Sequence, residues 1–256
     1  MRILIPGAGG LVGSALRARA ASSIHECVFL ERAECDVTDA HHRVEALRRY
    51  RPDAVLFCAA RTDVDACAVD PTAEAVNVTA PAAWARDVET WLLSSNFVFA
   101  GEGPHLPGEA PGPVGAYAGQ KARAEAAVLA AGGHVARVGW VYGPNGRTFA
   151  STLAARLRAG QAVRALYDLR VQPTWSLDLA DALLEMPRGV HHHVGRGEGS
   201  WYAVALAVHA RVRRGEVVPV RLAELGLTEP RPRDGRLAPA SLPPWWERMD
   251  ALVAAT

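Results

Sequence analysis

Tyr117 and Lys121 are the two residues whose types and spacing most directly indicate chemistry. They stand four positions apart in an alanine-rich stretch without proline, and residues four apart on a helix share one face. A free phenol has a pKa of about 10 and exchanges protons poorly at neutral pH, but a nearby ammonium group favours the phenolate and lowers that pKa. The pair therefore predicts a proton-transferring site, in which Lys121 also donates hydrogen bonds to cofactor hydroxyl groups.

Lys121 is also the only lysine in the chain, because every other residue among the 28 basic ones is Arg. On a solvated helix face we would expect arginine here, as everywhere else in this sequence. The planar, strongly basic guanidinium does not replace a compact ammonium group at a site shaped for one. The composition therefore favours a functional role for Lys121 over a place on a solvated helix.

A glycine-rich turn near the start of the sequence is a second feature with chemical meaning. It has the spacing G-x-x-G-x-x-G, follows an apolar run and precedes a helical pattern. One glycine of such a turn shapes it, one admits a pyrophosphate to backbone N–H groups, and one lets the helix pack on the sheet. A tight turn without a ligand is the alternative, but this context favours a dinucleotide site. Its predicted residues are Gly7, Gly10, Leu11, Val12 and Gly13.

The cofactor's ribose is read at the end of the second predicted strand, where Glu31 and Arg32 lie. A carboxylate there accepts a hydrogen bond from the free 2′-hydroxyl of NAD, whereas an arginine accommodates the 2′-phosphate of NADP. Because Arg32 adjoins the expected turn, NADP is the preferred cofactor and NAD the alternative. A surface ion pair between the two side chains would remove this inference.

Alternating apolar runs and helical patterns position these residues, as is typical of βαβ units in a parallel sheet. Strands are predicted over residues 2–6, 27–30, 54–58, 91–94 and 134–138, and helices over 13–21, 41–50, 71–90, 117–131, 149–159, 178–185 and 201–213. We therefore expect an α/β fold: a Rossmann-type doubly wound parallel sheet with a small, mostly helical C-terminal substrate-binding cap. Residues 1–145 would form the NAD(P)-binding core, and residues 146–256 the smaller substrate-binding portion, with some segments that return to the core.

The composition excludes several classes of function. The chain has 256 residues, of which 50% are hydrophobic, and its 28 basic and 27 acidic residues leave a net charge of +1. No basic patch indicates a nucleic-acid partner, and no apolar stretch approaches the roughly 20 residues that span a bilayer. The first residues enter a strand without a leader pattern, so a cytoplasmic location is expected. The four cysteines lack C-x-x-C spacing and are expected to be reduced.

The run His191-His192-His193 invites a metal-site interpretation. Successive residues on a strand point to opposite faces, so three adjacent histidines cannot converge on one ion. We therefore expect no metal site here, nor at His41-His42.

Further motifs give the sequence a resemblance over nearly its whole length. Ser94-Ser95-Asn96-Phe97-Val98-Phe99 is similar to Ser-Thr-Asp-Tyr-Val-Phe, and Arg51–Ala60 with Thr62–Asp65 is similar to P-D-x-V-x-N-x-A-A-x-T-x-V-D. Other matches are the V-N element at Asn77, R-x-x-W-x-Y-G at Arg137–Gly143, P-T…D-L at 173–179 and the late R-P pair Arg231-Pro232. With the glycine turn and Y-x-x-x-K, these motifs resemble the extended short-chain dehydrogenase/reductase family, in its dTDP-4-dehydrorhamnose reductase branch.

The resemblance implies roles for further residues. It places the adenine contact at Asp36 and Val37, and the turn beneath the cofactor at Cys58, Ala59 and Ala60. It places the catalytic hydroxyl at Ser95, with Ser94 as the alternative. Asn96 stands where the branch has an Asp, and Leu11-Val12 where it commonly has Gln-Leu. The residues that the resemblance implies for the substrate pocket are Thr62, Val64, Asn96 and Trp140.

The implied activity is NAD(P)H-dependent reduction of the keto group at C4 of a nucleotide-activated 6-deoxyhexose. Tyr117 would be the general acid, Lys121 would lower its pKa, and Ser95 would orient the carbonyl oxygen. Epimerisation or dehydration with recycled NAD is one alternative, although Ser95-Asn96 lacks the acidic pair usual in dehydratases of this fold. A non-catalytic NADP-binding regulatory subunit is another. The expected partner is the small-molecule substrate, and the expected assembly a homodimer.

Overall fold

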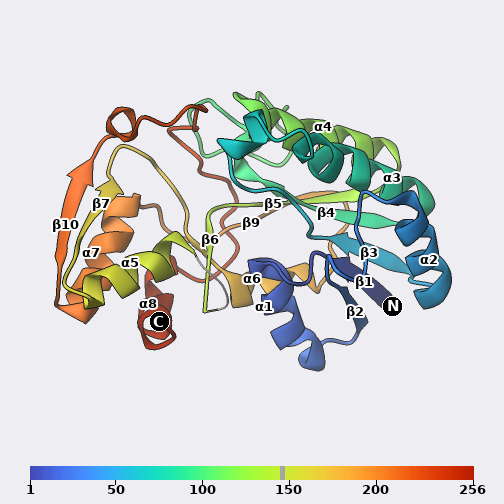
Figure 1. Ribbon diagram of the computed structural model, residues 1–256, viewed down its shortest axis with the longest axis horizontal. Coiled ribbons are helices and arrows are strands. Elements are labelled where there is room, and N and C mark those ends of the chain that lie inside the picture. Colours follow the sequence, from blue (N-terminus) through green and yellow to red (C-terminus); the bar gives the residue numbers. More distant parts are fainter. Residues whose placement is uncertain (145–147) are drawn as a thin grey trace.

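A six-stranded parallel sheet forms the centre of the molecule, in a computed structural model that describes residues 1–144 and 148–256 (Figure 1). The strands lie in the order β2-β1-β3-β4-β5-β9, and every neighbouring pair is parallel. Their bounds are β1 (Arg2–Pro6), β2 (Glu26–Leu30), β3 (Ala54–Phe57), β4 (Thr90–Ser95), β5 (His134–Val138) and β9 (Val190–His193). The predicted doubly wound α/β fold of Rossmann type is therefore confirmed.

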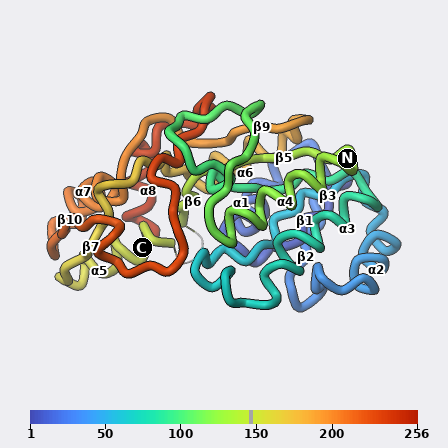
Figure 2. The backbone as a smooth tube through the Cα atoms, turned by 90° about the horizontal axis from the view of Figure 1, so that it is seen from above, coloured from blue at the N-terminus to red at the C-terminus, as the bar shows by residue number. Residues whose placement is uncertain are grey.

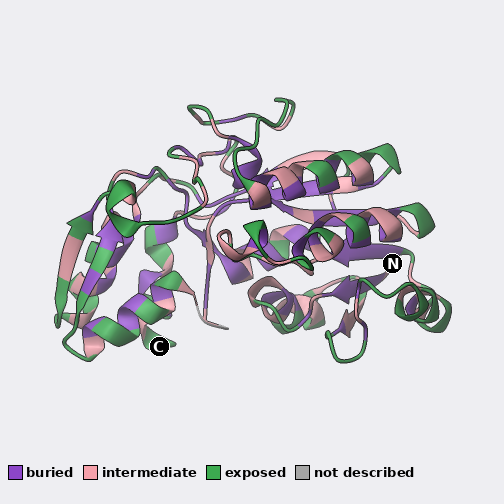
Figure 3. Ribbon diagram, turned by 45° about the horizontal axis from the view of Figure 1, so that its top comes forward, coloured by how far each residue is buried: buried purple, intermediate pink, exposed green. Residues whose placement is uncertain are grey.

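Helices cover both faces of this sheet (Figure 1). One layer consists of α2 (Ala40–Tyr50), α3 (Ala80–Asp87) and α4 (Ala116–Ala130), and the other of α1 (Leu11–Arg19) and α6 (Ser176–Leu183). Because side chains alternate along a strand, β1 serves both layers. Ile3 and Ile5 belong to the apolar cluster of Leu16, whereas Leu4 belongs to that of Trp84. Figure 3 shows the buried sheet between helices that are exposed only on their outer faces.

The cap lies beside the core and is built on its own apolar cluster (Figure 2). It contains α5 (Phe149–Arg158), α7 (Trp201–Val212) and α8 (Met249–Ala254), with a parallel pair of strands, β7 (Ala162–Leu166) and β10 (Glu216–Val220). Sequence analysis predicted helices at α5 and α7 but neither strand. Both strands are short, β7 contains an arginine and β10 contains Pro219, so neither stands out as an apolar run in the sequence. The domain boundary expected at residues 145 and 146 falls outside the described residues.

Shorter elements complete the chain. The strands β6 (Val141–Tyr142) and β8 (Thr174–Trp175) form a second parallel pair. A π-helical segment, Ala75–Thr79, leads directly into α3. The 3-10 turns are Ala20–Ser22, Ala66–Ala68, Asn96–Val98, Leu222–Leu225 and Trp245–Arg248.

Two predicted boundaries differ from the structure for local reasons. The first helix begins at Leu11 rather than at residue 13, so Gly13 lies inside the helix. A Cβ atom at Gly13 would stand 2.5 Å from the carbonyl oxygen of Gly7, so glycine allows the helix to start this close to the turn. The helix predicted over 71–90 is shorter: a π-helical segment begins at Ala75, α3 runs from Ala80 to Asp87, and Thr90 already belongs to β4.

The strand order sets where a ligand can bind. The strand β1 lies between β2 and β3, so the connections that follow β1 and β3 leave the sheet in opposite directions. In open parallel sheets the crevice at such a reversal, beyond the carboxyl ends of the strands, is where ligands bind. Pro6, Phe57 and Ser95 are the last residues of β1, β3 and β4, and all three lie at this edge.

Within the described residues, none of the helices has both the length and the apolar character needed to cross a membrane.

Candidate active site

The glycine turn and the turn after β3 pack directly against each other. Gly7 has a φ of +89°, and a Cβ atom there would lie 2.5 Å from the backbone nitrogen of Ala59. Gly10 donates its backbone N–H to the carbonyl oxygen of Gly7 at 3.1 Å. A Cβ atom at Gly9, in contrast, would meet nothing within 4 Å. The backbone conformation and the close contact with Ala59 thus require glycine at position 7, whereas Gly9 faces open space in the crevice.

A cavity of about 450 Å³ extends from these turns toward the end of β2. Of the residues predicted to bind the cofactor, its lining contains Gly7, Gly10, Arg32, Asp36, Val37, Cys58, Ala59 and Ala60. The carboxylate of Glu31 pairs with Arg17 at 3.2 Å. The structure thus pairs Glu31 with Arg17 and not with Arg32. The ion pair that would have weakened the inference of NADP does not form.

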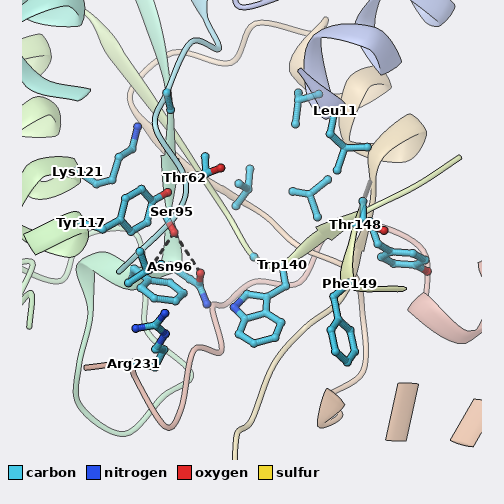
Figure 4. Close-up of a pocket in the computed structure, with 18 of the residues that line it drawn as sticks. Leu11, Thr62, Ser95, Asn96, Tyr117, Lys121, Trp140, Thr148, Phe149 and Arg231 are labelled. Carbon is cyan, nitrogen blue, oxygen red and sulfur yellow. Dashed lines mark hydrogen bonds between the residues drawn. The ribbon is translucent and has the colours of Figure 1, made fainter. Parts of the chain in front are cut away.

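A larger cavity of about 740 Å³ adjoins the first at Gly7, Gly10, Cys58 and Ala60 (Figure 4). It brings together the three residues predicted to be catalytic, which come from β4 and α4. The other predicted site residues in its lining are Leu11, Val12, Gly13, Thr62, Val64, Asn96 and Trp140. Residues that lie far apart in the sequence therefore share one continuous crevice.

Tyr117 is buried at the first turn of α4. Its ring meets that of Phe97 edge to face, with centroids 5.6 Å apart. Burial raises the pKa of Tyr117 to about 12 and outweighs the opposing effect of a hydrogen bond with Ser95. Sequence analysis expected Lys121 to lower this pKa, but in the structure desolvation dominates. The phenol is therefore protonated at neutral pH, the form in which it can donate a proton.

Lys121 lies one turn further along α4 and is 2% exposed. Its Nζ atom donates a hydrogen bond to the carbonyl oxygen of Leu93 in β4 at 2.8 Å. Burial lowers the pKa of Lys121 to about 8, while the negative charge of Glu125 acts in the opposite direction. The ammonium form therefore predominates at neutral pH and is lost as the pH rises through about 8.

The two candidate hydroxyl groups differ in their partners. Ser94 also lines the cavity, but it donates to Oε1 of Glu125 at 2.5 Å, so its hydroxyl proton is engaged by that carboxylate. Ser95 accepts a hydrogen bond from the backbone N–H of Phe97 at 3.2 Å, and its oxygen lies beside Tyr117 (Figure 4). This geometry favours Ser95 over Ser94. The neighbouring Asn96 donates through Nδ2 to the carbonyl oxygen of Gly235 at 2.8 Å, which fixes its amide.

Trp140 packs against the apolar cluster that contains Phe97 and Tyr117, and lies between Tyr117 and Phe149 in Figure 4. It is half-buried, and its ring stacks at a tilt on Trp201, with centroids 3.8 Å apart. The ring of Phe149 also packs on Trp201, with centroids 4.3 Å apart. These three rings give the cavity an aromatic wall.

Several lining residues were missed by sequence analysis. They include Gly9, Arg61, Thr148, Phe149, Arg164, Trp201, Leu222, Leu225, Leu227 and Arg231. Most come from the cap, where no local motif marks them. Arg231 was noted only as part of an R-P pair, without a role.

A knot of polar contacts joins three distant segments at the rim of this cavity. The carboxylate of Asp65 accepts from the backbone N–H groups of Thr228 and Glu229, at 3.1 and 2.9 Å, and pairs with Arg231 at 2.6 Å. Glu229 in turn accepts from the backbone N–H of Ala116 at 2.7 Å. Since Ala116 begins α4, the knot holds the end of the helix that carries Tyr117.

The histidine run lies on β9, outside this crevice. His192 hydrogen-bonds the carbonyl oxygen of Ala238 at 3.0 Å, and His191 hydrogen-bonds that of Arg188 at 2.6 Å. Over residues 1–144 and 148–256, no three His, Cys, Asp or Glu side chains are grouped so as to hold a metal ion. All four cysteines are unbridged.

A Rossmann-type sheet with a glycine turn at its switch point, and a buried tyrosine and lysine on the adjoining helix, defines a nucleotide-dependent oxidoreductase of the short-chain dehydrogenase type. Within that class, the chain belongs to the family described as the RmlD substrate binding domain, whose model matches residues 1–243. The resemblance inferred from the motifs is thus confirmed.

Named relatives agree with this assignment. The chain is 34% identical to a dTDP-4-dehydrorhamnose reductase of Mycolicibacterium smegmatis, over 99% of this chain and 85% of that protein. It is 31% identical to a dTDP-4-keto-6-deoxy-D-glucose reductase of Streptomyces niveus, over 90% of this chain and 87% of that protein. Its fold matches the crystal structure of dTDP-4-dehydrorhamnose reductase from Bacillus anthracis in complex with NADP. In that comparison the TM-score is 0.91 at 22% identity, over 100% of this chain and 99% of the other.

Proposed function

We propose that this protein reduces the keto group at C4 of a dTDP-activated 6-deoxyhexose, with NADPH as the preferred reductant. The observation that carries the proposal is the buried Tyr117 beside Ser95 and Lys121, in a cavity continuous with the glycine turn. A group that holds its proton at neutral pH suits reduction, because the alkoxide formed at the substrate must be protonated.

The residues present fit a dinucleotide. Gly9 leaves open space where a pyrophosphate would approach the turn, and Arg32 lines the cavity where a 2′-phosphate would lie. Arg61 lines the same cavity and adds a second positive charge there. When bound, the reduced nicotinamide supplies the hydride for the carbonyl carbon.

The chain's own residues supply the proton and the orientation. Tyr117 donates its proton to the developing alkoxide oxygen, and the Ser95 hydroxyl, held by the backbone of Phe97, orients the carbonyl oxygen. The ammonium group of Lys121 stabilises the phenolate that remains on Tyr117 and donates to ribose hydroxyl groups. Burial of both side chains excludes water from these steps.

The substrate side of the cavity suits a nucleotide sugar. Arg164 lines it and can pair with the diphosphate, whereas Arg231, which also lines it, is already paired with Asp65. Trp140 offers an indole face to the apolar face of a deoxyhexose, and Thr62 and Val64 border the same space. In this proposal the cap binds the nucleotide. The elements α6 and β9, which lie in the second half of the sequence, belong to the core.

The test is turnover of dTDP-4-keto-6-deoxyhexoses by the purified chain, followed by loss of absorbance of reduced nicotinamide and by analysis of the sugar product. We expect NADPH to be consumed in equal amount to the 4-hydroxy product, and NADH to be used less well. Tyr117→Phe is the matched control, since it removes only the hydroxyl group.

Other results would redirect the assignment. Isomerised or dehydrated sugar without net consumption of NADPH would indicate an epimerase or dehydratase. Tight NADPH binding without turnover of any keto sugar would indicate a regulatory subunit. A cytoplasmic location and a homodimer remain predictions from the sequence.

A further inference from the structure

Helix α4 contacts three successive residues of β4 near its carboxyl end. Lys121 donates to the carbonyl oxygen of Leu93 at 2.8 Å, Glu125 accepts from the hydroxyl of Ser94 at 2.5 Å, and Tyr117 hydrogen-bonds Ser95. Two of these three helix residues belong to the proposed catalytic machinery. The third, Glu125, has no part in the mechanism described so far.

Glu125 is buried and carries a buried partner. It is 1% exposed, and Arg137 of β5 is 2% exposed. The Nη2 atom of Arg137 donates to Oε2 of Glu125 at 2.7 Å, and its Nε atom lies 3.1 Å from both carboxylate oxygens. The other side of the guanidinium is held by the carbonyl oxygen of Pro107 and by the ring of Phe99. These contacts hold the carboxylate of Glu125 in one position inside the protein.

Few charged groups act on Lys121. On its own helix this group is Glu125, and from the segments packed against it they are Cys58 and Cys67. Burial raises the pKa of both thiols, so both are uncharged at neutral pH. In the described part of the chain, Glu125 is therefore the carboxylate whose charge offsets the cost of burying the ammonium group.

We propose that Glu125 is a positioning residue for the reduction, which sets the register of α4 on β4 through Ser94 and keeps Lys121 in its ammonium form. Its carboxylate is hydrogen-bonded to Ser94 and Arg137 rather than to Lys121. Its negative charge therefore acts on Lys121 across one helical turn, and the N–H donors of the lysine are not used for Glu125. These donors remain for the carbonyl oxygen of Leu93 and for the hydroxyl groups of a bound ribose. The inference rests on the proposed function, because it assigns Glu125 to the same site.

The experiment uses the fact that Lys121 is the only lysine. Protein labelled with ¹³C at the lysine Cε atom gives one side-chain resonance, which reports the protonation of Lys121 without any assay of activity. In the unmodified protein we expect a midpoint near pH 8. In Glu125→Gln, which keeps the shape of the side chain, the midpoint should fall by about 1 pH unit. The alkaline limb of kcat should move with it.

Controls separate positioning from general damage. Glu74→Gln removes an exposed carboxylate that pairs with Arg123 of α4 and should leave the Lys121 midpoint unchanged. Ser94→Ala keeps the charge of Glu125 and should lower kcat several-fold with little change of the midpoint. If Glu125→Gln does not fold, the double variant Glu125→Gln/Arg137→Met, which removes the whole buried pair, takes its place.

The outcomes are distinct. A lowered midpoint in the Glu125 variant, matched by a shifted pH profile, supports the inference. An unchanged midpoint, or a kcat reduced equally at every pH, overturns it and leaves Glu125 a structural residue. Absence of turnover in the unmodified protein would count against the proposed function alone, because the resonance of Lys121 still tests the role of Glu125.

Discussion

The two sides of the crevice are built in different ways. The cofactor side is made largely of backbone: the turns after β1 and β3 touch so closely that Gly7 has no room for a Cβ atom. The substrate side is made of side chains from the cap and from the Thr228–Arg231 segment, brought together by tertiary packing. The first kind of site depends on backbone geometry and tolerates little change, whereas the second depends on side-chain chemistry and can be altered by single substitutions.

The largest effect is expected where the two sides meet, at Tyr117. Tyr117→Phe removes the proton donor while it keeps the ring that packs on Phe97. We expect kcat to fall by about 100- to 10,000-fold, the usual range for loss of a general acid. NADPH binding, measured by fluorescence titration, should be retained. Near-normal turnover would remove the assignment of Tyr117.

A substitution at Gly7 tests whether the cofactor side depends on backbone. Gly7→Ala forces a side chain into a position with φ +89° and 2.5 Å from the nitrogen of Ala59. Strain of this kind costs a few kcal/mol, so NADPH affinity should fall about 100-fold.

Gly9→Ala is the matched comparison for the protein's own packing, because a Cβ atom there meets nothing within 4 Å of the protein. Calorimetric titration with NADPH measures the loss of affinity in Gly7→Ala, and thermal unfolding without cofactor should show a loss of stability in Gly7→Ala and none in Gly9→Ala. Equal losses of stability in the two variants would contradict the distinction between a turn shaped by the protein and a turn open to the ligand.

The pH dependence of reduction should sharpen the roles of the two buried groups. The pKa of Lys121 is lowered to about 8, so its charge is present below that pH and is lost above it. Tyr117, with a pKa raised to about 12, remains protonated throughout. We therefore expect kcat to be level near neutrality and to fall by about tenfold per pH unit well above pH 8. An alkaline limb that begins only near pH 10 would contradict this assignment.

Arg32 offers a test of cofactor choice within the backbone-built side. Arg32→Ala should weaken NADPH binding by about tenfold, the value of one charge-assisted contact, and leave NADH binding unchanged. The ratio of kcat/KM for the two cofactors measures this directly. Arg19→Ala, which removes an arginine of α1 that pairs with Asp181 of α6, serves as the control. Equal losses for both cofactors would show that Arg32 does not read the 2′-phosphate.

The smallest effect is expected at the aromatic wall. Trp140→Ala should raise KM for the sugar nucleotide about fivefold, as expected for loss of one aromatic contact, with KM for NADPH unchanged. Trp140→Phe keeps an aromatic face against Trp201 and should recover most of the loss. A change confined to thermal stability would instead indicate that Trp140 is a core residue.

Much of the fold follows from local pattern. The first five strands of the sheet and α4 were predicted within a few residues, because apolar runs and alanine content are local signals. The strands β7 and β10 were missed, since each is stabilised by the other, some fifty residues away in the sequence. Local pattern cannot report such a pairing.

The candidate site divides along the same line. Spacing placed Tyr117 and Lys121 on one helix face, and the structure puts both in the cavity. Sequence reasoning overestimated the effect of Lys121 on the pKa of Tyr117, because burial depends on the whole fold. Arg164 and Trp201 carry no motif and reach the cavity only through the packing of the cap. Their positions could not be read from neighbouring residues.

The knot around Asp65 has a consequence for the order in which the protein matures. It joins positions 163 to 166 residues apart, and through Glu229 it reaches the start of α4. During synthesis, the glycine turn and all strands of the main sheet leave the ribosome before residue 228. The helix that carries Tyr117 therefore receives its last anchor only after the dinucleotide site has been made. A nascent chain would acquire the ability to hold its cofactor before the ability to transfer a proton.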